Sequence, residues 1–128
     1  MNYSEQHHRT LARTETTTPV DELISGLCAT IADYPKPGIV FKDLTPVFAD
    51  GAALQAVVNA LVEPFHGQFD AVAGVEARGF LLAAAAAYAT GTGVITVRKA
   101  GKLPREVVAE DYALEYGNAT LELHTTDL

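Results

Sequence analysis

The sequence predicts a domain of the α/β class built around a parallel sheet. The first observation is the stretch 70–80, where a short apolar run passes Gly74, turns through charged residues and enters the apolar segment Phe80–Ala89. This pattern is typical of a strand, a tight loop and a helix. The second observation is the β-branched run Val94–Val97, which follows that helix after a glycine-containing turn. Two strands joined through one helix indicate a right-handed parallel βαβ unit.

Composition is typical of one globular domain that does not bind polyanions generally. The chain has 128 residues, of which 48% are hydrophobic, and this is enough for a core. The formal net charge of −7 argues against general affinity for nucleic acid or an anionic membrane. The longest apolar run, Phe80–Ala89, is about half the length of a membrane crossing. The N-terminal residues lack an apolar signal segment. Cys28 is the only cysteine, which excludes an internal disulfide, and we expect a cytoplasmic protein.

The first 33 residues divide into a tail and a helix. Residues 1–17 are polar and show no apolar period, so we expect a disordered tail followed by a domain over 18–128. Thr18 as the N-cap and Pro19 in the first turn form a typical helix start. The helix is expected to end near Asp33, because prolines follow. Apolar residues recur at helical spacing and predict one buried face: Val20, Leu23, Ile24, Leu27 and Ile31.

Residues 34–43 predict a rigid turn followed by an extended segment. The turn 34–38 contains two prolines and a glycine, and Ile39–Phe41 follows it. Backbone groups beside the flat ring of Phe41 have the chemistry needed to read a heterocyclic base. The alternative is that Val40 and Phe41 are core residues. A second amphipathic helix is expected over 52–65.

The loop after the strand of 70–80 is a candidate anion site. Loops at the carboxyl ends of parallel strands bind ligands, and the free amides at a helix start favour phosphate. We expect Gly74 and Gly79 to permit unusual backbone angles and close approach, and Arg78 to supply a planar fork that suits phosphate. The alternative is a plain turn in which Arg78 pairs with Glu76 or another acid.

Basic residues are concentrated after the strand Val94–Val97. Four of the nine basic residues lie within eight positions, which favours a small polyanionic ligand, although charge clusters are also found in ordinary solvated loops. Gly101 and Pro104 indicate a long mobile loop over 98–113 that closes over a ligand. The run 119–124 alternates as a partly exposed strand, with His124 on its exposed face. The four basic residues are Arg98, Lys99, Lys102 and Arg105.

Four blocks in this order resemble the adenine phosphoribosyltransferase family. They are Asp-Tyr-Pro-Lys-Pro-Gly-Ile-Val-Phe-Lys-Asp at 33–43, Gly-Val-Glu-Ala-Arg-Gly-Phe at 74–80, Val-Arg-Lys-Ala-Gly-Lys-Leu-Pro-Arg at 97–105 and Leu-Glu-Tyr-Gly at 114–117. The resemblance implies the type I phosphoribosyltransferase fold, a parallel sheet with an N-terminal hood helix and a mobile β-hairpin loop. It also implies a homodimer that joins adenine to the ribose of phosphoribosyl pyrophosphate, giving AMP and pyrophosphate. Mg²⁺ would be bound through phosphoribosyl pyrophosphate, with no direct protein ligands.

The resemblance implies a role for each motif residue. Phe41 would stack on adenine, the backbone of Val40 would read the ring edge, and Lys42 stands where the family keeps a basic residue. The loop would hold pyrophosphate through its amides and one guanidinium, with a non-proline cis peptide between the first two of its residues. These pyrophosphate-binding residues are Glu76, Ala77, Arg78 and Gly79.

The remaining roles belong to the segment after residue 97. Arg98, Lys99 and Lys102 resemble the cations that cover the departing pyrophosphate. Glu115 matches the acid that takes the adenine proton as the glycosidic bond forms, and Tyr116 would lie beside the ribose. The alternative for Glu115 is an ordinary surface carboxylate.

One family motif has no counterpart in these 128 residues. Family members continue past the position of Leu128 into a further strand and an Ala-Thr-Gly-Gly-Thr loop that binds the ribose and 5′-phosphate. We therefore expect a truncated sequence whose fold is incomplete at the C-terminus and whose isolated chain binds its ligands weakly and turns over nothing. Two alternatives stay open: a non-catalytic purine- or nucleotide-binding relative, and a phosphoribosyltransferase for another purine such as xanthine.

Overall fold

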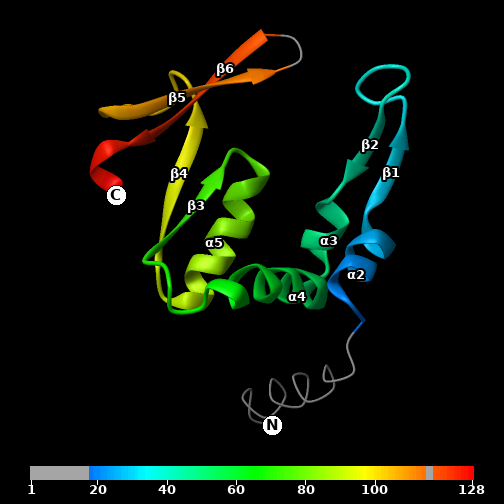
Figure 1. The fold of residues 1–128 in the computed structure, drawn as a ribbon. Coiled ribbons are helices and arrows are strands. Elements are labelled where there is room, and N and C mark those ends of the chain that lie inside the picture. The colour runs from blue at the N-terminus through cyan, green and yellow to red at the C-terminus, as the bar shows by residue number, and fades with distance from the viewer. Residues whose placement is uncertain (1–17, 115–116) are drawn as a thin grey trace. The chain divides into compact units, whose positions relative to one another are not determined.

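The computed structural model describes residues 18–114 and 117–128 (Figure 1). These residues divide into two units after Val57. The first unit contains the described residues up to Val57, and the second contains Val58–Leu128. The predicted tail over 1–17 and the predicted site residues Glu115 and Tyr116 lie outside the described residues.

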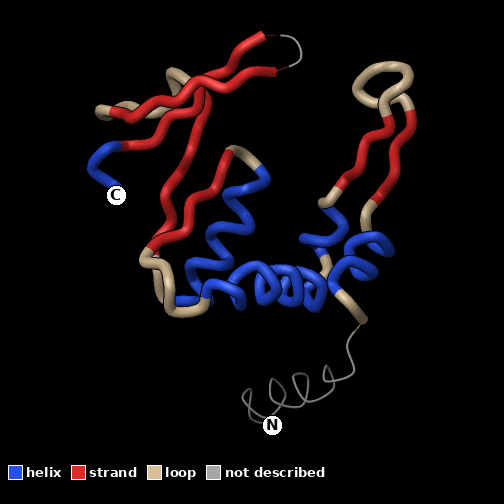
Figure 2. Tube along the Cα trace, in the orientation of Figure 1, coloured by secondary structure: helices blue, strands red, loops and turns tan. Residues whose placement is uncertain are grey.

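The first unit is a two-stranded sheet connected to short helices. Its elements are α2 (Val20–Leu27), β1 (Ala29–Ala32), β2 (Val40–Asp43), α3 (Thr45–Ala49) and the first part of α4 (Gly51–Val62). The two strands lie side by side (Figure 2). They are antiparallel, with Ile31 opposite Phe41. α2 and α3 are in contact. The predicted apolar stripe on α2 is half-buried at Val20, Leu23 and Ile24.

The first helix is shorter than the sequence predicts. It ends at Leu27, and Ala29–Ala32 form a strand, so the prediction of a helix to Asp33 is wrong. Thr30 and Ile31 are β-branched and pair with β2, and this pairing overrides the helical spacing of Ile31. The predicted Thr18 cap is also wrong, because Pro19 occupies the cap position without a side-chain hydrogen bond.

The predicted turn lies between β1 and β2, and local hydrogen bonds fix it. The Gly38 amide donates to the Asp33 carboxylate at 2.8 Å, and the Tyr34 amide donates to the Ile39 carbonyl at 3.1 Å. Gly38 has a φ of +88°, a left-handed conformation that glycine adopts without steric cost. The Tyr34–Pro35 bond is cis. This turn sets the register that places β2 beside β1.

The second unit contains a four-stranded mixed sheet in the order β3-β4-β6-β5. After the short η1 (Glu63–Phe65), its elements are β3 (Ala71–Val75), α5 (Arg78–Thr90), β4 (Gly93–Lys99), β5 (Val107–Leu114), β6 (Gly117–His124) and η2 (Thr125–Asp127). β3 and β4 are parallel, whereas β6 is antiparallel to both β4 and β5. α5 packs against β3 and β4, and its buried alanines form part of the core. The predicted strand–helix–strand unit is confirmed.

Close packing between β3 and α5 requires a glycine at position 74. A Cβ atom there would lie 2.5 Å from the Gly79 carbonyl oxygen and 2.7 Å from the Ala83 Cβ, which is closer than such atoms approach. At Gly79 a Cβ atom would meet its nearest neighbour at 3.5 Å, an ordinary contact. Neither glycine has a positive φ, so the prediction of unusual angles is wrong and that of close approach holds for Gly74.

The long loop predicted over 98–113 is mostly strand. β4 continues to Lys99 and β5 begins at Val107, so strands occupy both ends of the predicted loop and only 100–106 lie between them. The family resemblance predicted the hairpin correctly. His124 is 7% exposed, so its predicted exposure is wrong. Two segments cover the His124 side chain. Arg105 contacts it from a loop 19 residues earlier in the chain, and Asp127 contacts it from η2, directly after β6.

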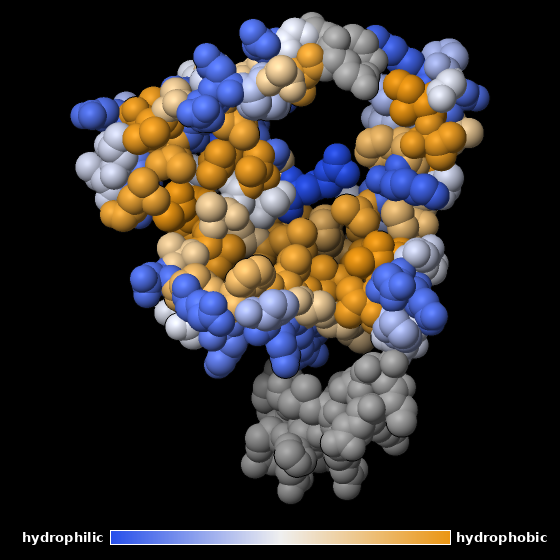
Figure 3. All heavy atoms as spheres, viewed as in Figure 1, coloured by the Kyte–Doolittle hydropathy of each residue, from blue (hydrophilic) through white to orange (hydrophobic). Residues whose placement is uncertain are grey.

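An apolar groove of about 620 Å³ runs beside β3 in the second unit. Its walls come from α5, from β3 and from the segment that precedes β3, including Phe65 and Phe69. The space-filling view shows apolar side chains gathered over α5 and its surroundings (Figure 3). β3 lies at the edge of the sheet. Within the described residues, every helix is too short or too polar to cross a membrane.

Candidate functional site

The loop between β3 and α5 has the backbone arrangement expected of an anion site. The Glu76 amide donates to the Val97 carbonyl at 3.0 Å, which continues the β3–β4 pairing by one residue. The Glu76–Ala77 peptide bond is cis, as the family resemblance implied. α5 then begins at Arg78, and among the described residues no side chain caps its first turn. Amide donors at such a helix start favour phosphate oxygens.

Glu76 is the residue on which the predicted cations converge. The Lys102 Nζ donates to Glu76 Oε2 at 2.6 Å, and the Lys99 amide donates to Oε1 at 2.6 Å. The Arg98 Nε lies 3.6 Å from Oε1, and the Glu76 side chain is only 9% exposed. The hydrogen bonds from Lys102 and from the Lys99 amide, together with the charges of Lys102 and Arg98, hold the pKa of the Glu76 carboxyl below its usual value. The structure therefore joins the loop before α5 to the segment after β4.

Arg98 has a second contact that sequence reasoning missed. Its guanidinium carbon lies 5.9 Å from the centre of the Phe80 ring, within the range of a cation–π interaction. Its Nε is shielded from solvent and forms no hydrogen bond within the described residues. The sequence does contain a signal for this contact: an aromatic residue stands two positions after Arg78, at the start of the helix that precedes the strand ending in basic residues. Phe80 therefore holds the guanidinium from the side of α5.

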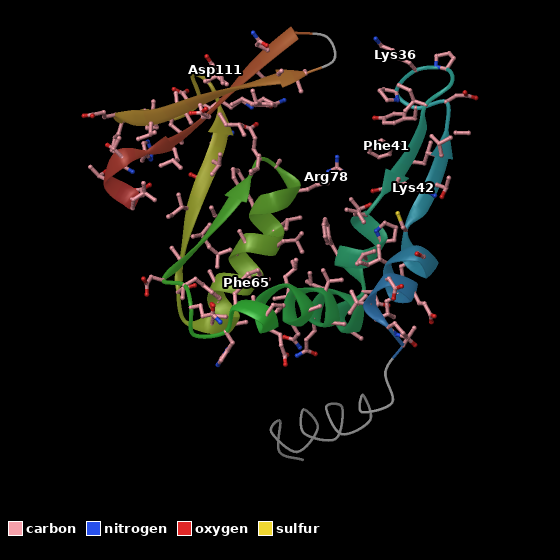
Figure 4. The ribbon with its side chains drawn as sticks, viewed as in Figure 1. Lys36, Phe41, Lys42, Phe65, Arg78 and Asp111 are labelled. Atoms are coloured by element: carbon pink, nitrogen blue, oxygen red, sulfur yellow. The ribbon has the colours of Figure 1, made fainter. Side chains whose placement is uncertain are left out.

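Arg78 is the first residue of α5, and its side chain projects from that end of the helix (Figure 4). Its position at the first turn is the one that the sequence predicted for a phosphate-binding guanidinium. Ala77 precedes it at the cap position and Gly79 follows it in the helix. The four predicted loop residues are therefore contiguous around one helix start.

Arg105 belongs to a different cluster from the other three cations. Its guanidinium donates to the Thr126 hydroxyl at 2.7 Å and to the Asp127 carboxylate at 3.1 Å. The His124 Nδ1 lies 3.2 Å from the same carboxylate. The hydrogen bond from Arg105, supported by its charge and by His124, keeps the pKa of Asp127 below its usual value. Arg105 therefore connects the loop after β4 to the segment after β6.

The predicted adenine-binding residues lie together on β2, in the first unit. Val40 is 61% exposed, so the alternative that it is a core residue is wrong. The Phe41 ring is half-buried and meets Tyr34 edge-on, with ring centres 5.1 Å apart and planes at 68°. The exposed Lys42 donates through Nζ to the Thr30 hydroxyl at 2.8 Å (Figure 4). Tyr34 is a second residue that sequence reasoning did not assign, and it supports the Phe41 ring.

Glu115 and Tyr116 lie between Leu114 and Gly117, where β5 ends and β6 begins, but outside the described residues. Their predicted roles stay predictions. Within 18–114 and 117–128, no three His, Cys, Asp or Glu side chains are grouped to hold a metal ion.

Known proteins resemble all or most of the chain. An adenine phosphoribosyltransferase of Arthrobacter sp. (strain FB24) is 77% identical over 128 residues, which are 100% of this chain and 66% of that protein. The crystal structure of the Thermoanaerobacter pseudethanolicus enzyme of the same name has a TM-score of 0.74 and 45% identity, over 83% of this chain and 62% of that one. The Saccharomyces cerevisiae enzyme, complexed with adenine and an imino-altritol bisphosphate, has a TM-score of 0.76 and 32% identity. The match covers 85% of this chain and 65% of that one.

No protein-family model matches the chain. The chain spans 62–66% of the length of the three proteins that it resembles. The match with the Arthrobacter protein spans all of the predicted motifs, and the solved structures share the α/β fold of type I phosphoribosyltransferases. The chain therefore belongs to the adenine phosphoribosyltransferase family.

Proposed function

We propose that the protein acts in purine salvage, where it joins adenine to phosphoribosyl pyrophosphate and releases AMP and pyrophosphate. The observation that carries the proposal is the 77% identity over all 128 residues with an adenine phosphoribosyltransferase. The gathering of Arg98 and Lys102 around Glu76, beside the start of α5, supports it, because the reaction expels a polyanion.

Adenine would bind at β2. The Phe41 ring offers a flat apolar face, and the backbone of the exposed Val40 offers a donor and an acceptor to the edge of a base. The Tyr34 ring, edge-on to Phe41, would limit the tilt of the stacking ring. The yeast relative complexed with adenine supports this ligand class.

Pyrophosphate would leave against the loop 76–79. Negative charge grows on the leaving group as the bond to the ribose breaks, so fixed donors lower the barrier most where that charge develops. The amides around Ala77–Gly79 and the Arg78 guanidinium provide donors on one side, and Arg98 and Lys102 provide positive charge on the other. Each hydrogen bond to a charged group contributes about 1.5–3 kcal/mol.

Mg²⁺ would arrive on the phosphates of phosphoribosyl pyrophosphate. The described side chains beside the start of α5 are mainly cationic, so they suit phosphate oxygens better than a metal ion. When bound, Mg²⁺ would neutralise part of the phosphate charge. Glu115 would accept the adenine proton and Tyr116 would lie beside the ribose, as the family resemblance implies.

A cytoplasmic homodimer is part of the same proposal. The single cysteine suits a reducing compartment. Leu81 and Tyr88 lie two turns apart on α5 and are 57% and 92% exposed, an apolar surface of the kind that a second copy covers. Sedimentation of the protein from its complete gene should give the mass of two chains, and the mass of one chain would contradict the dimer.

The activity is tested with protein expressed from the complete gene. Adenine, phosphoribosyl pyrophosphate and Mg²⁺ should give AMP and pyrophosphate in equal amounts. Xanthine in place of adenine should give no nucleotide, and omission of phosphoribosyl pyrophosphate provides the background. Folded protein that binds adenine but forms no AMP would point to a non-catalytic relative, and turnover of xanthine would point to another purine.

A further inference from the structure

We propose that the Glu76 carboxylate is a positioning residue that gathers Arg98 and Lys102 beside the start of α5 before the anionic substrate binds. The inference rests on the proposed function, because it concerns how the pyrophosphate site is prepared. In this proposal the Glu76 carboxylate has a different role from the neighbouring backbone amides. The amides bind pyrophosphate directly, whereas the carboxylate binds Arg98 and Lys102, which then bind pyrophosphate.

The contacts of Glu76 join two segments that lie far apart in the chain. Oε1 accepts the Lys99 amide and Oε2 accepts the Lys102 ammonium, from residues 23 and 26 positions away. Arg98 approaches the same carboxylate from the end of β4 at 3.6 Å. Both oxygens are thus engaged, and the side chain is 9% exposed. A carboxylate in this position fixes the segment after β4 against the loop before α5.

A negatively charged side chain is a poor ligand for pyrophosphate, but it can bind the cationic side chains that in turn bind pyrophosphate. An ionised carboxylate only accepts hydrogen bonds, so it cannot donate to a phosphate oxygen. Arg98 and Lys102 repel one another, and a carboxylate between them offsets that repulsion. Glu76 therefore lowers the free energy needed to bring two cations to one place.

The arrangement leaves the cations able to bind an anion. Lys102 has three ammonium donors and uses one on Glu76 Oε2. Arg98 approaches Glu76 through Nε, and its guanidinium carries further donors on the terminal nitrogens. Phe80 supports the Arg98 guanidinium from α5. Cations that are already oriented lose less freedom when the ligand binds, which is the advantage of preorganisation.

Substitution of Glu76 in the protein from the complete gene tests this role. Glu76→Gln keeps an oxygen for the Lys99 amide but removes the charge that holds Arg98 and Lys102. We expect pyrophosphate affinity, measured by calorimetry, to fall about tenfold, the equivalent of one charged hydrogen bond. The KM for phosphoribosyl pyrophosphate should rise similarly, whereas the KM for adenine stays unchanged.

Glu122→Gln is the matched control. Glu122 accepts the Gly101 amide at 2.7 Å, so it contacts the same loop, yet it forms no ion pair within the described residues. Its substitution should leave pyrophosphate affinity at the wild-type value. Glu76→Asp keeps the charge on a shorter side chain and should give an affinity between those of wild type and Glu76→Gln.

The possible results distinguish failure of the positioning role of Glu76 from failure of the proposed function. Pyrophosphate that binds Glu76→Gln as tightly as wild type, or more tightly, would overturn the positioning role, as would wild-type protein without pyrophosphate affinity. If Glu76→Gln does not fold, wild-type affinity in Glu76→Asp would overturn it instead. Wild-type protein that binds pyrophosphate but forms no AMP would contradict the proposed function alone.

Discussion

Gly74 is the residue that determines how closely α5 approaches β3. The Gly79 carbonyl and the Ala83 methyl occupy the space that a side chain at 74 would need. The sequence predicted a close approach at this glycine, because it ends a strand just before a helix. Which of the two glycines in the motif is required depends on distances between the strand and the helix, and these follow only from the folded backbone.

Alanine at the two glycines should have opposite effects on stability. Gly74→Ala forces a Cβ into contacts of 2.5 and 2.7 Å and should lower the free energy of unfolding by about 1–3 kcal/mol. Gly79→Ala meets only ordinary contacts within a helix and should be neutral or stabilising by up to about 1 kcal/mol. Urea denaturation of both variants measures the difference. Equal destabilisation would contradict the packing account.

Asp127 should make stability depend on pH in the acid range. Its pKa is lowered in the folded protein by Arg105, so the carboxylate favours folding above its unfolded pKa of about 3.9. This contribution is lost as the pH falls through the lowered folded value. The loss of stability between pH 5 and pH 2 should therefore be smaller in Asp127→Asn than in wild type. Asp70→Asn, at an exposed acid without an ion pair among the described residues, should follow the wild-type curve.

Phe41 should contribute to adenine affinity rather than to kcat. If its ring stacks on the base, Phe41→Ala should weaken adenine binding by about 1–3 kcal/mol and leave kcat little changed. Steady-state kinetics with adenine varied at saturating phosphoribosyl pyrophosphate separates the two parameters. Phe65→Ala, at an exposed ring with no assigned role, is the control. A fall in kcat with unchanged adenine affinity would contradict stacking.

Elements defined by local pattern were predicted, and elements defined by distant pairing were not. The strand, loop and helix over 70–90 and the strand after them were predicted because apolar period and glycine turns lie within each segment. β1 was predicted as helix, because Ile31 continues a helical spacing while its pairing with Phe41 is not visible locally. The residue pattern predicted β5 as loop for the same reason, because its partner β6 decides its conformation, and only the family resemblance implied a hairpin.

The turn between β1 and β2 should depend on one glycine. Gly38 has a φ of +88°, so Gly38→Ala should destabilise the first unit by about 1–2 kcal/mol. Gly26 lies inside α2, where a Cβ atom meets nothing within 4 Å, and Gly26→Ala should stabilise by up to about 1 kcal/mol. Thermal melts compare the two. Equal melting temperatures would contradict the role of the left-handed turn.

In the molecule as a whole, an acidic chain brings two basic side chains to one carboxylate. The net charge is −7, yet Arg98 and Lys102 meet at Glu76, beside the start of α5. The sequence predicted these residues as a group. It did not predict that Glu76 binds Lys102, or that Arg105 lies apart from this pair and binds Asp127. Both pairings join segments more than 20 residues apart.

Glu115 should affect the chemical step of the whole reaction. A general base contributes about 10²–10⁴-fold to a rate, so Glu115→Gln should lower kcat by that factor with little change in either KM. Glu110→Gln, at an exposed acid on β5, is the control. Equal losses of kcat and of substrate affinity would contradict the role of base.

The position of bound pyrophosphate decides whether the loop before α5 and the cation Lys102 form the pyrophosphate site. Crystals of the protein from its complete gene, soaked with pyrophosphate and Mg²⁺, should show the anion against Ala77–Gly79, within hydrogen-bond distance of the Arg78 guanidinium and the Lys102 ammonium. Pyrophosphate bound elsewhere in an enzyme that forms AMP would contradict the account.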